Sequence, residues 1–261
     1  MRLTHLEDSW ILVNGLPVLV RQTKRGDRPD APVLIHLHGV GMSGTYMLPA
    51  ADALAGEFRT NVPDLPGFGR SVKTGIPPTV EGLATSTRDV MDALSVDRAT
   101  LIGNSMGCMT VLEFAHRYPE RIDRAILCSP GRPVYQPLAR GIWQITRLII
   151  EEPIGMLPIL IHDYVRSGAR DLMSLYRSMG SYPTSRRFLQ LTVPTLILRG
   201  SRDPFVTERE LSRYVARPGG GITAASIPGA GHTMNYSHPV ETAAAIRAFL
   251  RPTGQGSAIG L

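Results

Sequence analysis

Residues 101–108, Leu-Ile-Gly-Asn-Ser-Met-Gly-Cys, constrain the fold of this chain more than any other stretch of it. The run at 98–102 predicts a strand that enters a Gly-Asn-Ser-Met-Gly turn, and apolar residues at helical spacing then predict a helix. A strand, a sharp turn with one serine at its apex and a helix are the pattern of a nucleophile elbow. The glycines fit this interpretation, because so tight a turn leaves no room for a Cβ two residues either side of Ser105.

An ordinary strand-to-helix turn would have a similar local sequence. The match is the only one of its kind in the chain, and it stands between a β pattern and an α pattern. A catalytic Ser105 also requires a base, an orienting acid and an oxyanion site, which the rest of the chain has to supply.

Short apolar runs alternate with helical patterns along most of the chain. A continuous apolar run, typical of a strand buried on both faces, occurs at 33–37, and further strands are predicted at 59–62, 122–128, 192–199 and 222–227. Helical patterns occur at 45–56, 81–94 and 239–250. Two further β runs flank Asn14-Gly15, which favours a tight hairpin. This order predicts an α/β fold, with a mostly parallel twisted sheet and helices on both faces.

The alternation breaks between residues 132 and 187, where the pattern is helical and amphipathic. We interpret 132–187 as a helical cap inserted into a core formed by 1–131 and 188–251, followed by a flexible tail at 252–261. Extra helices packed on the core would give the same pattern. The segment offers apolar and aromatic candidates for a pocket lining, and arginines at 140, 147, 166, 170 and 177.

Four residues come just after predicted strands: Val40, Ser105, Asp203 and His232. Ligands bind beyond the carboxyl ends of parallel strands, so these residues are expected at one edge of the sheet. A serine hydroxyl needs a base within reach, and His232 can take its proton while Asp203 holds the second ring nitrogen. The amides of Val40 and Met106 are expected to form the oxyanion hole. Taken singly, Asp203 could cap a helix and His232 could stabilise a loop, but their order after the elbow favours a catalytic triad.

The other candidate acids and bases are expected to have structural roles. Asp64 lies in a stretch dense in turn residues, where a carboxylate commonly caps the turn. Asp163, the other acid considered for the triad, does not follow a predicted buried strand at the proposed active edge. His36 and His38 are expected to hold loop geometry, and His238 precedes Pro239 at the start of a helix. Neither a metal site nor a cofactor is expected.

Five stretches give the chain a resemblance to the α/β-hydrolase superfamily, of the compact, capped kind, over nearly its whole length. They are His38-Gly39, the sequence Asp-Leu-Pro-Gly-Phe-Gly-Arg-Ser at 64–71, the elbow at Ser105, Gly-Ser-Arg-Asp at 200–203, and Gly231-His232. The resemblance implies the α/β-hydrolase fold and a serine hydrolase similar to carboxylesterases and meta-cleavage C–C hydrolases. The related epoxide hydrolases and haloalkane dehalogenases carry aspartate at the elbow, so the serine here makes their alkyl-enzyme route unavailable.

Three functions stay open at this point. The first is hydrolysis of a carboxylic ester or thioester through an acyl-Ser105 intermediate. The second is C–C bond hydrolysis with the same triad, against which the short loop at 38–44 argues, because it lacks the longer Gly/Pro-rich form of that group. The third is a non-catalytic ligand-binding relative, against which the complete set of Ser105, Asp203 and His232 argues.

Composition narrows the class of partner. The net charge is +6, but the arginines are scattered, so nucleic-acid binding is not expected. No apolar run reaches the length of a transmembrane helix, and the N-terminus lacks the apolar core of a signal peptide.

Cys108 and Cys128 fall on predicted core elements and are expected to be buried thiols in a cytoplasmic protein. The expected partner is a small-molecule substrate, with no membrane, and the oligomeric state is left open.

Overall fold

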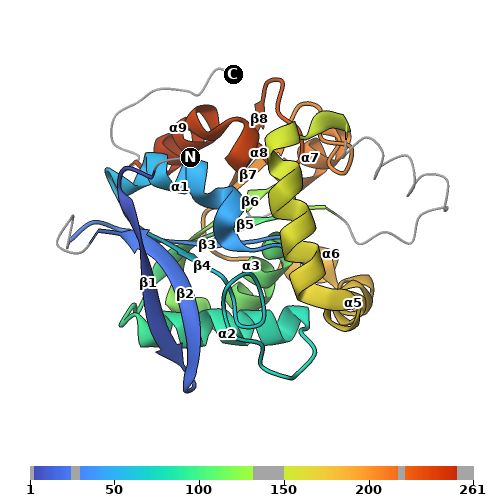
Figure 1. Cartoon of the computed structure of the whole chain (residues 1–261). Helices are drawn as coiled ribbons and strands as arrows, with labels where there is room; N and C mark the ends of the chain where they lie inside the picture. Colours follow the sequence, from blue (N-terminus) through green and yellow to red (C-terminus); the bar gives the residue numbers. More distant parts are fainter. Residues whose placement is uncertain (1–2, 25–29, 132–149, 217–220, 252–261) are drawn as a thin grey trace.

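The computed structural model describes residues 3–24, 30–131, 150–216 and 221–251 (Figure 1). The predicted tail, 252–261, and the first part of the predicted cap, 132–149, lie outside these residues, and with them Arg140 and Arg147.

One sheet of eight strands forms the centre of the described chain, in the order β1-β2-β4-β3-β5-β6-β7-β8. The strands are β1 Leu6–Val13, β2 Leu16–Thr23, β3 Val33–Leu37, β4 Arg59–Pro63, β5 Ala99–Asn104, β6 Ile122–Cys128, β7 Thr195–Gly200 and β8 Ile222–Ile227. β2 runs antiparallel to β1 and β4, and all the other pairs are parallel. The predicted hairpin is confirmed, because Asn14 and Gly15 turn between β1 and β2 with positive φ angles of 51° and 80°.

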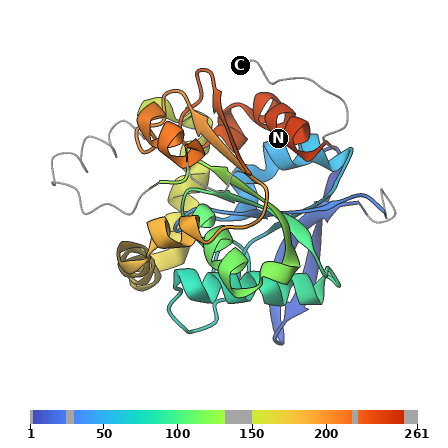
Figure 2. The same ribbon diagram turned by 180° about the vertical axis from the view of Figure 1, so that it is seen from behind.

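Helices cover both faces of the sheet, as Figures 1 and 2 show from opposite sides. One face carries α1 Leu48–Ala55, α8 Met234–Ser237 and α9 Pro239–Leu250, and the other carries α2 Val80–Ala93 and α3 Met106–Arg117. α7 Glu208–Val215 follows β7, and short 3₁₀ turns at Gly44–Met47 and Pro119–Arg121 complete the layers. The predicted α/β fold is therefore confirmed.

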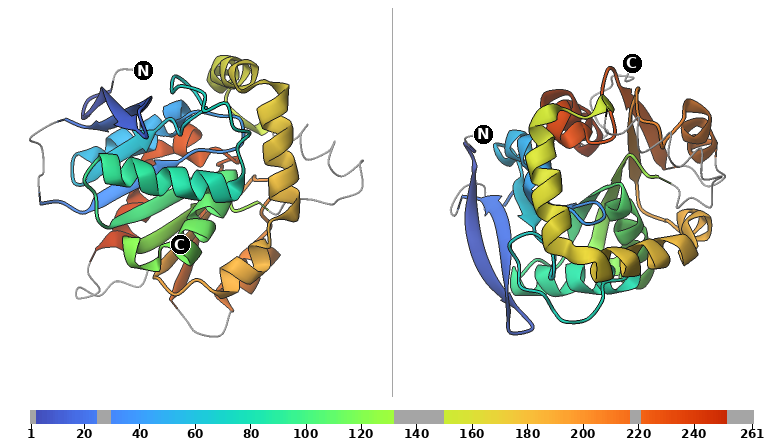
Figure 3. Two further views of the ribbon diagram at one scale, coloured as in Figure 1. Left: turned by 90° about the horizontal axis from the view of Figure 1, so that it is seen from below. Right: turned by 45° about the vertical axis from the view of Figure 1, so that its right-hand side comes forward.

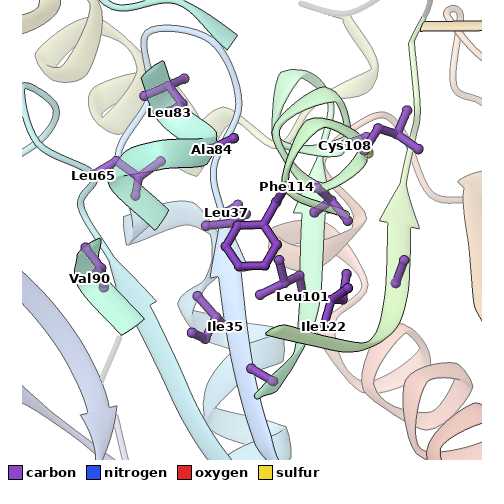
Figure 4. Packing of buried hydrophobic residues seen from close by; sticks show 14 of the residues in the cluster. Ile35, Leu37, Leu65, Leu83, Ala84, Val90, Leu101, Cys108, Phe114 and Ile122 are labelled. Carbon is purple, nitrogen blue, oxygen red and sulfur yellow. The ribbon is translucent and has the colours of Figure 1, made fainter. Parts of the chain in front are cut away.

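Successive side chains of a central strand enter different apolar layers. Leu34 of β3 packs with the α1 and α9 layer, whereas Ile35 and Leu37 pack in the layer of α2 and α3, with Phe114 of α3 (Figure 4). All three aliphatic side chains are fully buried. This burial on both faces explains why the sequence of β3 is apolar at successive positions instead of alternating between apolar and polar residues.

Several element boundaries differ from the sequence expectations, three of them for a specific physical reason. β5 continues to Asn104, because Asn104 is buried and hydrogen-bonded despite being polar. The helix expected at 45–56 divides into a 3₁₀ turn and α1, with Pro49 in the first turn of α1, where its missing N–H is not needed. β7 begins at Thr195 because Pro194 has no N–H to donate to a ladder.

The described part of the segment between β6 and β7 is helical. It contains a 3₁₀ turn at Ile154–Met156, α5 Leu157–Ser181 and α6 Thr184–Leu189. α5 bends at Gly168, whose φ of 76° and ψ of 158° are non-helical, and Figure 3 shows its two halves running in different directions. No described helix has both the length and the apolarity needed to cross a membrane.

Candidate active site

The nucleophile elbow has the geometry that its sequence predicts. Ser105 stands between β5 and α3 with a φ of 56° and a ψ of −119°, a conformation that non-glycine residues rarely adopt. A Cβ on Gly107 would clash with the carbonyl oxygen of Leu37, and one on Gly103 would clash with the backbone of Gly107. Glycine is required at both positions, so that β3, β5 and α3 can approach closely around the serine.

Asp203 and His232 form a buried pair at the ends of β7 and β8. His232 Nδ1 lies 3.2 Å from each carboxylate oxygen of Asp203, and the two residues are 7% and 6% exposed. The amide of Phe205 donates to Asp203 Oδ1 at 2.8 Å, and the Phe205 ring packs against the imidazole with centroids 4.9 Å apart. Gly200 lets the two loops meet, because a Cβ there would clash with the Gly231 carbonyl.

The pair is arranged to stabilise a positive imidazole. Burial alone lowers the pKa of His232, but the carboxylates of Asp203 and Glu152 raise it above its ordinary value of 6.5. Burial alone raises the pKa of Asp203, but the charge and hydrogen bond of His232, with the Phe205 amide, lower it below 3.8. Asp203 therefore stays ionised and can stabilise the imidazolium that forms when His232 takes a proton.

The serine lies on the loop next to this pair. Asn104, the residue before Ser105, donates from Nδ2 to the backbone oxygen of His232 at 3.2 Å. Within the described part of the chain, no hydrogen bond joins the Ser105 hydroxyl to His232. The structure thus pairs Asp203 with His232, and the Asn104 side chain links the Ser105 loop to the His232 loop. Catalytic hydrogen bonds often tighten only when substrate is bound.

The Gly-rich loop after β3 also approaches the serine. A Cβ on Gly39 would lie 3.4 Å from Ser105 Cβ, which places the loop residue before Val40 directly beside the serine. Met106 begins α3, and the first amides of a helix have no acceptor within it. The use of the Val40 and Met106 amides as an oxyanion hole stays a prediction.

Two polar residues that the sequence analysis did not single out connect these loops. The Tyr46 hydroxyl donates to Asn104 Oδ1 at 2.8 Å and accepts from the Gly39 amide at 2.9 Å. Glu152 accepts from the Thr233 amide at 2.9 Å and from the Thr233 hydroxyl, one residue beyond His232. The residues joined by these contacts are separated by 58 positions in one case and by 81 in the other, so no local sequence pattern could predict the contacts.

The rival acids have structural partners. Asp64 is fully buried and accepts hydrogen bonds from Arg21 and from the amides of Gly44 and Arg70. This agrees with the predicted turn-capping role of Asp64. Asp163 accepts from Ser43.

The other histidines also have structural positions. His38 accepts from the Leu65 amide and contacts the Gly39 carbonyl, and burial lowers its pKa. Burial lowers the pKa of His36 to about 3, and neither of its ring nitrogens has a partner among the described residues. His238 lies at the start of α9, as its sequence predicts, with Nδ1 3.0 Å from Ser237 Oγ.

Both cysteines are buried and free, as expected. Burial raises the pKa of the Cys128 thiol to about 12 and that of Cys108 well above its ordinary value. Such thiols are poor nucleophiles. No group of three or more potential metal ligands occurs among the described residues.

A comparison with known proteins places the chain in a family. The sequence profile of the Alpha/beta hydrolase family matches residues 34–245, a span that contains Ser105, Asp203 and His232. The chain belongs to this family. The resemblance inferred from the five sequence stretches is thereby confirmed.

The relatives of this hydrolase have more than one activity. It is similar to carboxylesterase YbfK of Bacillus subtilis, with 27% identity over 229 residues, which cover 80% of the chain and 77% of YbfK. The crystal structure of that esterase has a TM-score of 0.75 at 23% identity, over 95% of this chain and 92% of the other, which shows the shared fold. The hydrolase is also 32% identical over 144 residues to the 2-hydroxy-6-oxo-6-phenylhexa-2,4-dienoate hydrolase of Burkholderia cepacia, covering 52% of the chain and 50% of that enzyme.

Another similarity is more local. Protein Rv2715 of Mycobacterium tuberculosis is 34% identical over 102 residues, which cover 39% of this chain and only 30% of Rv2715. The match therefore concerns less than a third of that relative's length.

Proposed function

We propose that this chain is a serine hydrolase that cleaves a carboxylic ester or thioester of a small-molecule substrate through an acyl-Ser105 intermediate. The observation that carries the proposal is the buried His232–Asp203 pair next to a strained serine at the elbow. The similarity to a carboxylesterase over most of both chains supports the ester as substrate class.

The proposed reaction uses each of these groups in turn. Ser105 Oγ attacks the carbonyl carbon while His232 Nε2 takes the hydroxyl proton, and Asp203 stabilises the imidazolium through Nδ1. The oxyanion that forms accepts hydrogen bonds from the Val40 and Met106 amides. The imidazolium then protonates the departing alcohol or thiol. A water molecule, deprotonated by His232, attacks the acyl carbon and releases the acid and free Ser105.

We further propose that residues 132–187 form a cap over a core of 1–131 and 188–251. Contacts of α5 with the loop after β3 support this, since a Cβ on Gly41 would touch Leu172 and Tyr164 of α5. The buried free thiols fit a reducing compartment, so we propose a cytoplasmic location.

A C–C bond hydrolase is the second candidate, and the similarity to a dienoate hydrolase favours it. A panel of p-nitrophenyl esters, acyl thioesters and vinylogous diketones separates the two, with Ser105→Ala as the blank. Serine-dependent turnover of esters or thioesters supports the proposal, whereas turnover of the diketones alone would assign C–C cleavage. A panel without any serine-dependent turnover would favour a non-catalytic binding protein.

Asp203→Asn is expected to lower kcat by up to about four orders of magnitude with the fold retained, because the amide no longer fixes the imidazole tautomer. The measurement is steady-state kinetics on the best ester, with a melting curve for each variant. Asp64→Asn is the comparison. It removes the buried carboxylate that pairs with Arg21, which then keeps the longer ion pair to Asp8 at 3.8 Å, and it is expected to lower Tm, with a much smaller loss of kcat. If the two losses in kcat were reversed, the acid would be Asp64.

The pH dependence of kcat/KM should report the pKa of free His232, which must be neutral to act as a base. Because Asp203 and Glu152 raise that pKa, the rising limb is expected above 6.5. Glu152→Gln removes one of the two carboxylates that raise the pKa of His232, so the rising limb of the pH–rate profile should move to lower pH. Glu151→Gln, at the neighbouring position, should leave the limb in place. A limb that stays fixed in Glu152→Gln would contradict this account of the base.

A further inference from the structure

Helix α5 holds the loop that carries Val40 through two buried side chains. Asp163 accepts two hydrogen bonds from Ser43, at 2.7 Å from its amide and 2.6 Å from its hydroxyl. Four residues further along α5, the Ser167 hydroxyl donates to the Gly41 carbonyl at 2.9 Å. Asp163 and Ser167 are each 2% exposed, so neither contact competes with bulk water.

These hydrogen bonds hold the backbone of the residues that directly follow Val40. Gly41 has a φ of 67°. The hydroxyl of Ser167 holds the Gly41 carbonyl, which belongs to the peptide between Gly41 and Met42. Ser43 presents both donors to the same carboxylate oxygen, and bonds to a charged acceptor are stronger than bonds between neutral groups. On the other side of Val40, the Gly39 amide is held by Tyr46. The loop is therefore fixed on both sides of the amide assigned to the oxyanion hole.

The bend in α5 lies next to this contact. Gly168 interrupts the helix directly after Ser167, and the Ser167 carbonyl accepts from Lys73 Nζ at 2.7 Å. Lys73 also pairs with Asp171 at 3.0 Å, in the second half of the helix. Lys73 thus links both halves of α5 to the core close to Ser167, which bonds to the loop after β3.

We propose that Asp163 and Ser167 are positioning residues that set the oxyanion hole from the cap, by holding Gly41 and Ser43 so that the Val40 amide faces the reacting carbonyl. The inference rests on the proposed acyl-Ser105 chemistry. Donors that are fixed in advance stabilise the charge that develops in the transition state, and a displaced donor loses that effect without changing how the ground state binds.

The test uses an alkyl fluorophosphonate, whose phosphoryl oxygen occupies an oxyanion hole while Ser105 Oγ bonds to phosphorus and fluoride leaves. The second-order labelling rate is measured for the full chain and for Asp163→Asn, Ser167→Ala and the control Ser181→Ala, with a melting curve for each. Ser181 is an exposed serine of the same helix whose hydroxyl bonds to the carbonyls of Arg177 and Ser178 in α5 itself. We expect labelling to slow by about tenfold to a hundredfold in the first two variants and by less than about twofold in the control. With p-nitrophenyl butyrate, kcat should fall by a similar factor while KM changes little.

A purely structural anchor would give a different pattern, with a lower Tm but unchanged labelling rate and kcat in folded Ser167→Ala. That result, with Ser105 labelled normally in the unmodified chain, would overturn the positioning role and leave the proposed function standing. Failure of the unmodified chain to label at Ser105 would overturn both.

Discussion

Ser105→Ala is expected to lower kcat by about six orders of magnitude when chemistry limits the rate. The variant keeps the elbow, the His232–Asp203 pair and the amides, but it has no atom that can form the acyl intermediate. Within the described residues the Ser105 side chain makes no hydrogen bond, so its loss leaves no partner unsatisfied and Tm should change little. Steady-state kinetics and thermal unfolding of purified protein check both expectations.

Near-normal turnover in Ser105→Ala would contradict the assignment once contamination by unmodified enzyme is excluded. A large loss of Tm would instead show that the hydroxyl contributes to the fold. Only a large loss of kcat in a protein that melts normally supports a nucleophile.

His232→Ala is expected to have a loss of similar size, because the nucleophile and its base act as a unit and removing either disables both. The rising limb of the pH–rate profile should vanish with it. The variant also removes the imidazole partner of the buried Asp203 carboxylate, so Tm should fall. His232→Gln, which retains a side-chain donor, gives a second variant in which the loss of kcat can be measured on folded protein.

His238→Ala is the matched control, since His238 is only six positions away and lies at the start of α9. Its nearest polar contact is Ser237, and nothing connects it to Asp203 in the described structure. Both kcat and the pH limb should therefore stay close to those of the unmodified enzyme. The opposite result in the two histidine variants would move the base to His238.

Structural features that depend on residues adjacent in the sequence could be predicted from the sequence. The elbow glycines were predictable because a single turn imposes both, and the strands predicted at 33–37, 122–128 and 222–227 match β3, β6 and β8. The pairing of Asp203 with His232 was also predictable, because parallel strands bring their carboxyl ends to one edge. The four-residue helix α8 was missed because it is too short for a periodic pattern.

The contacts that position the site were not predictable from sequence. Ser43 meets Asp163 from 120 positions away, and the two are ordinary polar residues in their own segments. Only the packing of α5 against the loop after β3 shows that Asp163 bonds to Ser43 of that loop, and so has a structural role instead of competing with Asp203 as the partner of His232. Asn104 likewise looked like a turn residue until its bonds to Cys128 and His232 were seen.

The central claim is that Ser105 is a nucleophile activated by His232. Its most direct test is fluorophosphonate labelling of the full chain, followed by intact-mass measurement and peptide mapping. We expect one label per chain, located on Ser105, with no label in Ser105→Ala and strongly slowed labelling in His232→Ala. A label on another residue, or an enzyme that turns over esters while Ser105 stays unlabelled, would contradict the account.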